Sequence, residues 1–192
     1  MRRAMCLAAL LLAGPAQAEP FHHPFGEWRE YNRDWLAACP DAINEDAPDF
    51  QGYSCFASTG SAALNAANLP AYKLTLIRNR LNGALDLAIT VAADGAVYDQ
   101  ARPIELRFGG EPPIRLSMGT DLEIRHNTTN QFFVIGEQTR AALIEKMQER
   151  TALVLAVPLE GVVQPAEIRL SLQGVMASLD FMSAYARRVA QY

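Results

Sequence analysis

Side chains suited to acid–base or metal chemistry are scarce in this chain. It contains three histidines, His22, His23 and His126, and histidine is the side chain that most readily exchanges protons near neutral pH. None stands in the H-E-x-x-H spacing with which a helix holds zinc. His22 and His23 could bind copper or zinc weakly, but flanking prolines and the lack of a third ligand favour an extended segment. His126, in an Asn- and Thr-rich stretch, is typical of a polar turn.

Carboxylates gather in one stretch, at Glu45, Asp46 and Asp49. Paired carboxylates can hydrolyse glycosides or bind calcium, but a solvated acidic loop is the simpler interpretation here. The G-x-S-x-G turn of many hydrolases is absent. We therefore predict no catalytic residue, no cofactor and no metal site. A periplasmic hydrolase or an inhibitor-type module, with a pocket formed only in three dimensions, remains the alternative.

The first eighteen residues have the pattern of an export signal. Arg2 and Arg3 precede an apolar stretch at 4–13, and Ala16-Gln17-Ala18 is typical of a cleavage site. Cleavage near Ala18 would leave a periplasmic or secreted protein. The chain has 17 basic and 21 acidic residues, so without Arg2 and Arg3 the balance becomes 15 against 21, a net charge of −6. No basic run interleaves with aromatic residues, so we expect no nucleic-acid partner.

Two cysteines, Cys39 and Cys55, remain after cleavage because Cys6 lies in the export signal. An oxidising compartment favours a disulfide between them. Closing the loop 40–54 should stabilise the fold by about 3 kcal/mol. A metal site or a redox pair is the alternative, although no histidine is near and the C-x-x-C spacing is missing.

The period of the apolar residues predicts a mainly β protein. Alternation between apolar and polar residues indicates half-buried strands at 85–91, 104–108, 114–118, 122–124 and 168–172, and continuous apolar runs indicate central strands at 132–135 and 153–157. Glycine-based turns separate them. We predict an antiparallel β-sandwich or barrel-like sheet with two minor helices. Residues 19–24 would form an extended lead and 25–192 a single domain, with no transmembrane segment after cleavage.

Two segments have a helical period instead. Thr139 could cap a helix in which Leu143, Ile144 and Met147 share one face. The second helix is expected from about Val175 to the end of the chain. Its apolar stripe could pack on the protein's own sheet or bind a partner, and it comprises Val175, Leu179, Met182, Ala186 and Val189.

Aromatic residues are dense between positions 21 and 56. They could pack around the cysteine pair and close one end of the sandwich. They could also form a recognition surface for an envelope protein or a polysaccharide. The residues that we selected for that surface are Trp28, Tyr31, Trp35, Phe50 and Tyr53.

The order of these motifs resembles the invasion-associated locus B family of exported bacterial proteins. An export signal leads to Phe25-Gly26-Glu27-Trp28, then a cysteine pair, a β-rich body, and a strand that enters a helix through Leu172-Gln173-Gly174. In that family the first cysteine usually follows the tryptophan closely, whereas here residues 29–38 intervene. The resemblance implies an exported, disulfide-bearing β-sandwich without assigned catalytic residues. We therefore expect a non-enzymatic envelope protein that binds a macromolecule.

Overall fold

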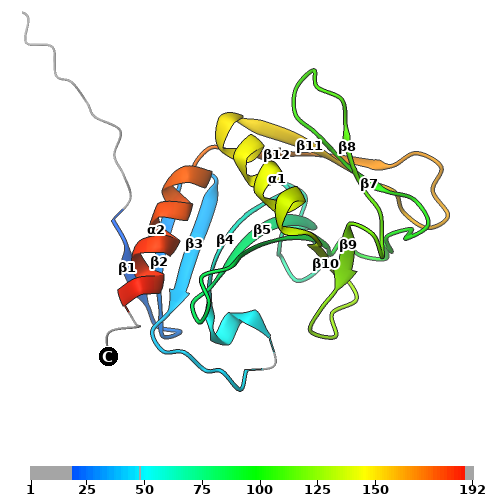
Figure 1. Cartoon of the computed structure of the whole chain (residues 1–192). Helices are drawn as coiled ribbons and strands as arrows, with labels where there is room; N and C mark the ends of the chain where they lie inside the picture. The colour runs from blue at the N-terminus through cyan, green and yellow to red at the C-terminus, as the bar shows by residue number, and fades with distance from the viewer. Residues whose placement is uncertain (1–18, 48, 189–192) are drawn as a thin grey trace, which may run out of the picture.

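The computed structural model describes residues 19–47 and 49–188. The described strands form two sheets in which every pairing between strands is antiparallel (Figure 1). The eight-stranded sheet has the order β1-β2-β3-β4-β5-β6-β10-β9, and the four-stranded sheet has the order β12-β11-β7-β8. Because β1 and β9 end the larger sheet without pairing with each other, the sheet is not a closed barrel. The prediction of a mainly β fold with two helices is confirmed.

The strands of the larger sheet are β1 (Phe21–His23), β2 (Glu27–Asn32), β3 (Trp35–Pro40), β4 (Ser54–Gly60), β5 (Tyr72–Asn79), β6 (Leu85–Val91), β10 (Gln131–Val134) and β9 (Leu122–Ile124). Those of the smaller sheet are β12 (Ala166–Ser171), β11 (Ala152–Val157), β7 (Ile104–Arg107) and β8 (Ile114–Leu116). The helices are α1 (Glu137–Glu149), α2 (Val175–Arg188) and the short 3₁₀ turn η1 (Phe50–Gly52). No described helix is long and apolar enough to cross a membrane.

The main hydrophobic core lies where the two sheets and the two helices meet. Its members include Leu76 of β5, Ile89 of β6, Leu106 of β7 and Leu155 of β11, each with no exposed surface. Alternation along these strands sends every second side chain into this core, as the sequence pattern predicts. Both sheets therefore belong to one hydrophobic unit.

Helix α1 begins three residues earlier than we predicted. Gly136, with φ at +82°, stands at its N-terminus, and Thr139 lies inside the first turn. The chain leaves β10 and turns directly into the helix, and a glycine permits the positive φ of that turn. The predicted face is correct, because Leu143, Ile144 and Met147 are buried.

Helix α2 packs on the larger sheet, across β2, β3, β4 and β5. Val175, Phe181 and Met182 are buried, whereas Leu179 and Ala186 are only half-buried. The predicted packing is therefore confirmed, with its centre closer to Phe181 and Met182 than the predicted stripe implied. Val189, the last member of that stripe, lies outside the described residues.

The N-terminal segment is extended, as predicted, but it also forms regular structure. Residues Phe21–His23 are β1, the edge strand that pairs with β2. We expected Pro20 and Pro24 to prevent regular structure. They flank the strand instead, at an edge where proline removes no hydrogen bond from the interior of the sheet.

The predicted disulfide between Cys39 and Cys55 is present. It joins neighbouring strands β3 and β4, and both cysteines are buried against the main core. The chain between them carries the acidic stretch and η1. The bond therefore closes this long connection at its base.

Candidate functional site

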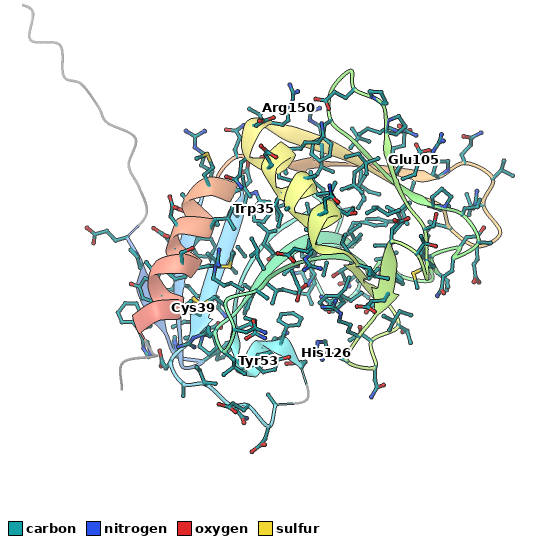
Figure 2. All side chains as sticks on the ribbon, in the orientation of Figure 1. Trp35, Cys39, Tyr53, Glu105, His126 and Arg150 are labelled. Carbon is teal, nitrogen blue, oxygen red and sulfur yellow. A yellow bond between two sulfur atoms is a disulfide. The ribbon has the colours of Figure 1, made fainter. Side chains whose placement is uncertain are left out.

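The five aromatic residues selected from the sequence do not form one surface. Trp35 has no exposed surface, and its indole Nε1 donates a hydrogen bond to the carbonyl oxygen of Ser171 at 3.1 Å (Figure 2). It therefore belongs to the core. Our placement of Trp35 on a binding surface is wrong, because the side chain points from β3 toward β12.

Phe50 and Tyr53 belong to a second, smaller hydrophobic cluster on the other face of the larger sheet. Phe50 is buried there with Ile77, Ala88 and Phe133, and Tyr53 packs against them. The side chain of Asp49 caps η1 by accepting a hydrogen bond from the backbone of Gln51 at 2.9 Å. Packing in this cluster accounts for Phe50 and Tyr53, and capping of η1 accounts for Asp49.

His126 closes the same cluster from the turn after β9. Its ring lies 6.1 Å from that of Phe50 and 5.7 Å from that of Phe133, measured between centroids. The guanidinium of Arg125 stands 4.9 Å from the Phe133 ring centre, a favourable cation–π distance. The structure places His126 in a turn, as predicted, with aromatic neighbours and no set of metal ligands.

Trp28 and Tyr31 lie on opposite faces of β2. Trp28 faces α2, where its ring lies 5.7 Å from that of Tyr185 and 5.5 Å from that of His22. Tyr31 faces the other way and stacks on Phe21 at 6.0 Å. Tyr31 is three positions after Trp28, and successive side chains of a strand point to opposite faces, so an odd spacing puts the two rings on different faces.

Three exposed aromatic residues lie together on one side of the β1–β2 hairpin, whereas Trp28, which is 37 % exposed, lies on the other side. We call the former side the aromatic hairpin face, and it comprises Phe21, His23, Phe25, Arg29 and Tyr31. Phe25 is 81 % exposed, Tyr31 51 % and Phe21 39 %. The Phe25 ring lies 4.6 Å from that of His23 and 5.6 Å from the Arg29 guanidinium. Contiguous exposed apolar residues are a common feature of interaction surfaces.

Sequence reasoning noted Phe21 and Phe25 but did not select them. The signal that could have found them is register: Phe21 pairs with Arg29 and His23 with Glu27. With β1 recognised as a strand, alternation would place Phe21, Arg29 and Tyr31 on one face. We missed this surface because the flanking prolines led us to predict no strand there.

Burial and ion pairs shift the pKa values of several titratable groups. Burial, with the nearby Asp99, raises the pKa of Tyr98 to about 12. Hydrogen bonds from Arg107 and Arg115 lower the pKa of Glu105, and a hydrogen bond from Lys146 lowers that of Glu111. Each of these three shifts moves the pKa of the group away from neutral pH.

Among the described residues, no group of three His, Cys, Asp or Glu side chains could hold a metal ion. Nε2 of His22 lies 2.6 Å from Oδ2 of Asp41, the one carboxylate that it contacts within residues 19–47 and 49–188. A depression of about 400 Å³ lies over β11, and its lining includes Arg107, Arg150 and Arg169. Its charged groups are guanidinium groups and Glu167, a set typical of ion pairing.

Comparisons with known proteins define the fold but not the family. No protein-family model matches the chain, and no curated protein matches it in sequence. The chain is similar in structure to invasion associated protein B from Bartonella henselae, with a TM-score of 0.54 and 16 % identity. The match covers 83 % of this chain and 98 % of that one. The shared fold agrees with the resemblance seen in the sequence.

Proposed function

We propose that this protein is an exported, non-enzymatic envelope module that binds another protein through the aromatic hairpin face. The exposure of Phe25, beside the stacked pair Phe21 and Tyr31, is the observation that carries the proposal. The export pattern, the disulfide and the fold shared with invasion associated protein B support the envelope location. That protein's name refers to invasion, and we do not transfer that role to this chain.

The composition of the face suits a protein interface. Aromatic residues and arginine supply much of the binding energy in such interfaces. Burying Phe25 fully would contribute about 2 kcal/mol from apolar area alone. Arg29 forms an ion pair with Glu27 beside the rings, which provides a polar margin to an apolar centre.

A protein partner fits this face better than a polysaccharide does. The hydroxyl groups of a sugar need hydrogen-bonding side chains when they lose water. Phenylalanine offers none, Arg29 is already paired with Glu27, and Nδ1 of His23 accepts a hydrogen bond from the backbone of Phe25. Beyond these contacts, the polar atoms of the face are the Tyr31 hydroxyl, Nε2 of His23 and the remaining N–H groups of Arg29, which are few for a sugar site.

Site-specific photo-crosslinking in isolated cell envelopes tests the proposal. A photoreactive phenylalanine analogue would replace Phe25, and the matched control would carry it at Val97, which is 55 % exposed and lies outside the hairpin. We expect one discrete protein adduct from position 25 and none from position 97. Sedimentation with purified peptidoglycan tests the polysaccharide alternative in parallel.

Three results would reject the proposal. They are no protein adduct at position 25, the same adducts at positions 25 and 97, or sedimentation with peptidoglycan that Phe25→Ala abolishes. N-terminal sequencing of the mature protein tests export independently, and we expect it to begin at Glu19.

A further inference from the structure

Strand β12 forms one edge of the four-stranded sheet. It pairs with β11 along its whole length, from Val157 opposite Ala166 to Ala152 opposite Ser171. No other described strand pairs with it. An open strand edge presents unpaired N–H and C=O groups that can pair with another chain.

The direction of the backbone groups along β12 follows from one hydrogen bond. The N–H of Leu172 donates to the carbonyl oxygen of Thr151 at 2.9 Å, so the backbone of Leu172 faces β11. Antiparallel ladders alternate between hydrogen-bonded and non-hydrogen-bonded pairs. The backbones of Leu170 and Ile168 therefore also face β11, and those of the residues between them point toward the open edge.

Part of this edge is covered by the protein itself and part is open. The carbonyl of Ser171 points outward and accepts the hydrogen bond from Trp35, which confirms the alternation independently. The outward backbone groups of Glu167 and Arg169 have no partner among the described residues. Both side chains are exposed, so residues 166–170 form an accessible edge.

The side chains on this edge are self-complementary. Glu167 and Arg169 stand on one face of the sheet, and Ile168, between them, stands on the other. Glu167 forms an ion pair with Arg107, whereas Arg169 has no ion pair among the described residues. When two such strands run antiparallel about Ile168, each Glu167 faces an Arg169.

We propose that a second copy of this chain binds here, with its β12 antiparallel to the first across a twofold axis at Ile168. The two pairs of Glu167 and Arg169 become hydrogen-bonded pairs, since both residues point their backbone groups outward. The two Ile168 residues form the non-hydrogen-bonded pair between them, where side chains approach closely. The two four-stranded sheets then form one continuous sheet.

The structure also explains where this proposed strand pairing would stop. In this register Pro165 of one copy lies opposite Ser171 of the other. Proline has no N–H to donate, and the Ser171 carbonyl is already bonded to Trp35. The ladder therefore ends after residues 166–170. An interface this short corresponds to a weak, micromolar or weaker, association.

Charged residues on an edge strand can instead serve to prevent pairing. Like charges would act that way, because they face each other when two copies meet. Here acidic and basic residues alternate about Ile168, and the register that pairs the backbone also pairs opposite charges. Cross-strand pairs of opposite charge stabilise a sheet and like charges destabilise it.

Sedimentation equilibrium of the mature chain at low salt tests the charge complementarity. We expect a monomer–dimer equilibrium in the parent, at least about tenfold weaker in Arg169→Glu and in Glu167→Arg. A mixture of these two variants should recover dimers, because each Glu then faces an Arg. Arg115→Glu, on the opposite edge strand β8, is the matched control and should dimerise like the parent.

A cysteine at the twofold axis tests the register. The two Cα atoms of residue 168 would lie about 4.5 Å apart in a non-hydrogen-bonded pair, within the range of a disulfide. Ile168→Cys should therefore form a covalent dimer in air much faster than Arg169→Cys, whose thiols face Glu167 of the other copy. A monomeric parent, no recovery in the mixture, or equal cross-linking of the two variants would each overturn the proposal.

Discussion

Strands β1 to β3 present aromatic rings to both faces of the larger sheet, and α2 covers only one of them. On the covered face Trp35 has no exposed surface, whereas on the other face Tyr31, only four positions earlier, is 51 % exposed. Phe25 is 81 % exposed at the turn between β1 and β2. Aromatic residues are therefore buried in the fold on one face and exposed on the other.

Polar contacts also fix the covered face. The side-chain amide of Asn32 donates to the hydroxyl oxygen of Ser178 at 3.3 Å, inside the interface between β2 and α2. The Ser171 hydroxyl donates to the carboxylate of Asp34 at 2.5 Å. The Asn32–Ser178 bond specifies how α2 sits on the sheet, because a shifted helix would leave these buried polar groups unpaired. The exposed Ser171–Asp34 bond ties β12 to the turn between β2 and β3.

The largest loss of stability is expected from a charge in the covered interface. Met182 has no exposed surface, so Met182→Asp should lower the free energy of unfolding by about 4 kcal/mol or prevent folding. Leu179→Asp should cost less, because Leu179 is half-buried. Met176→Asp, at a position 57 % exposed, is the control. Urea denaturation measures all three, and equal effects at 176 and 182 would contradict the assignment of faces.

A backbone change at the start of α2 tests the same interface. Gly174 has φ at +105°, and a Cβ atom there would overlap the carbonyl oxygen of Asn32. Gly174→Ala should therefore lower the free energy of unfolding by about 3 kcal/mol. Gly83→Ala has a similar positive φ but open space around it, and we expect about 1 kcal/mol. Equal losses in the two variants would mean that the close approach to β2 is not required.

The disulfide between β3 and β4 also stabilises the covered face of the larger sheet. Replacing both Cys39 and Cys55 with alanine should lower the free energy of unfolding by about 3 kcal/mol on the chain-entropy model. Thiol titration of the denatured, unreduced mature parent should find no free thiol. Two free thiols would contradict the bond, and an unchanged melting temperature in the double variant would show that the connection is already ordered without it.

The smallest effect on stability is expected on the exposed face. Phe25→Ala should change the free energy of unfolding by no more than about 0.5 kcal/mol, because the ring gains little burial on folding. Trp35→Ala, the matched aromatic on the covered face, should cost about 4 kcal/mol. A large loss from Phe25→Ala would show that the hairpin aromatics are part of the fold rather than a surface for a partner.

The sequence predicts both helices and the strands from β6 onward, but it names none of the strands β1 to β5. The strand at 85–91 and the helical face of Leu143 and Met147 are local patterns, and both are confirmed. The strand is not half-buried as predicted, because Ala88 and Thr90 are buried on its other face. The hairpin between β2 and β3 has no Asn-Gly signal, and it turns through Arg33 with φ at +56°, a conformation uncommon for arginine. Without that turn, the faces of Trp28 and Trp35 cannot be assigned.

Long-range contacts decide the rest of the candidate site. Phe50 is buried because Phe133, distant in the sequence, lies across from it. The exposure of Phe25 depends on the pairing of β1 with β2, which the flanking prolines concealed. No local pattern distinguishes these two phenylalanines, so the sequence could predict a dense aromatic region but not which rings remain exposed.

The most direct test uses the partner protein that cross-links to position 25, once it is identified and purified. Its affinity is measured for the parent and for the double variant Phe25→Ala/Tyr31→Ala. Isothermal titration should show binding weakened by about a hundredfold or more in the double variant, with its free energy of unfolding within about 1 kcal/mol of the parent. An affinity equal to that of the parent would contradict the claim that the aromatic hairpin face is the binding surface.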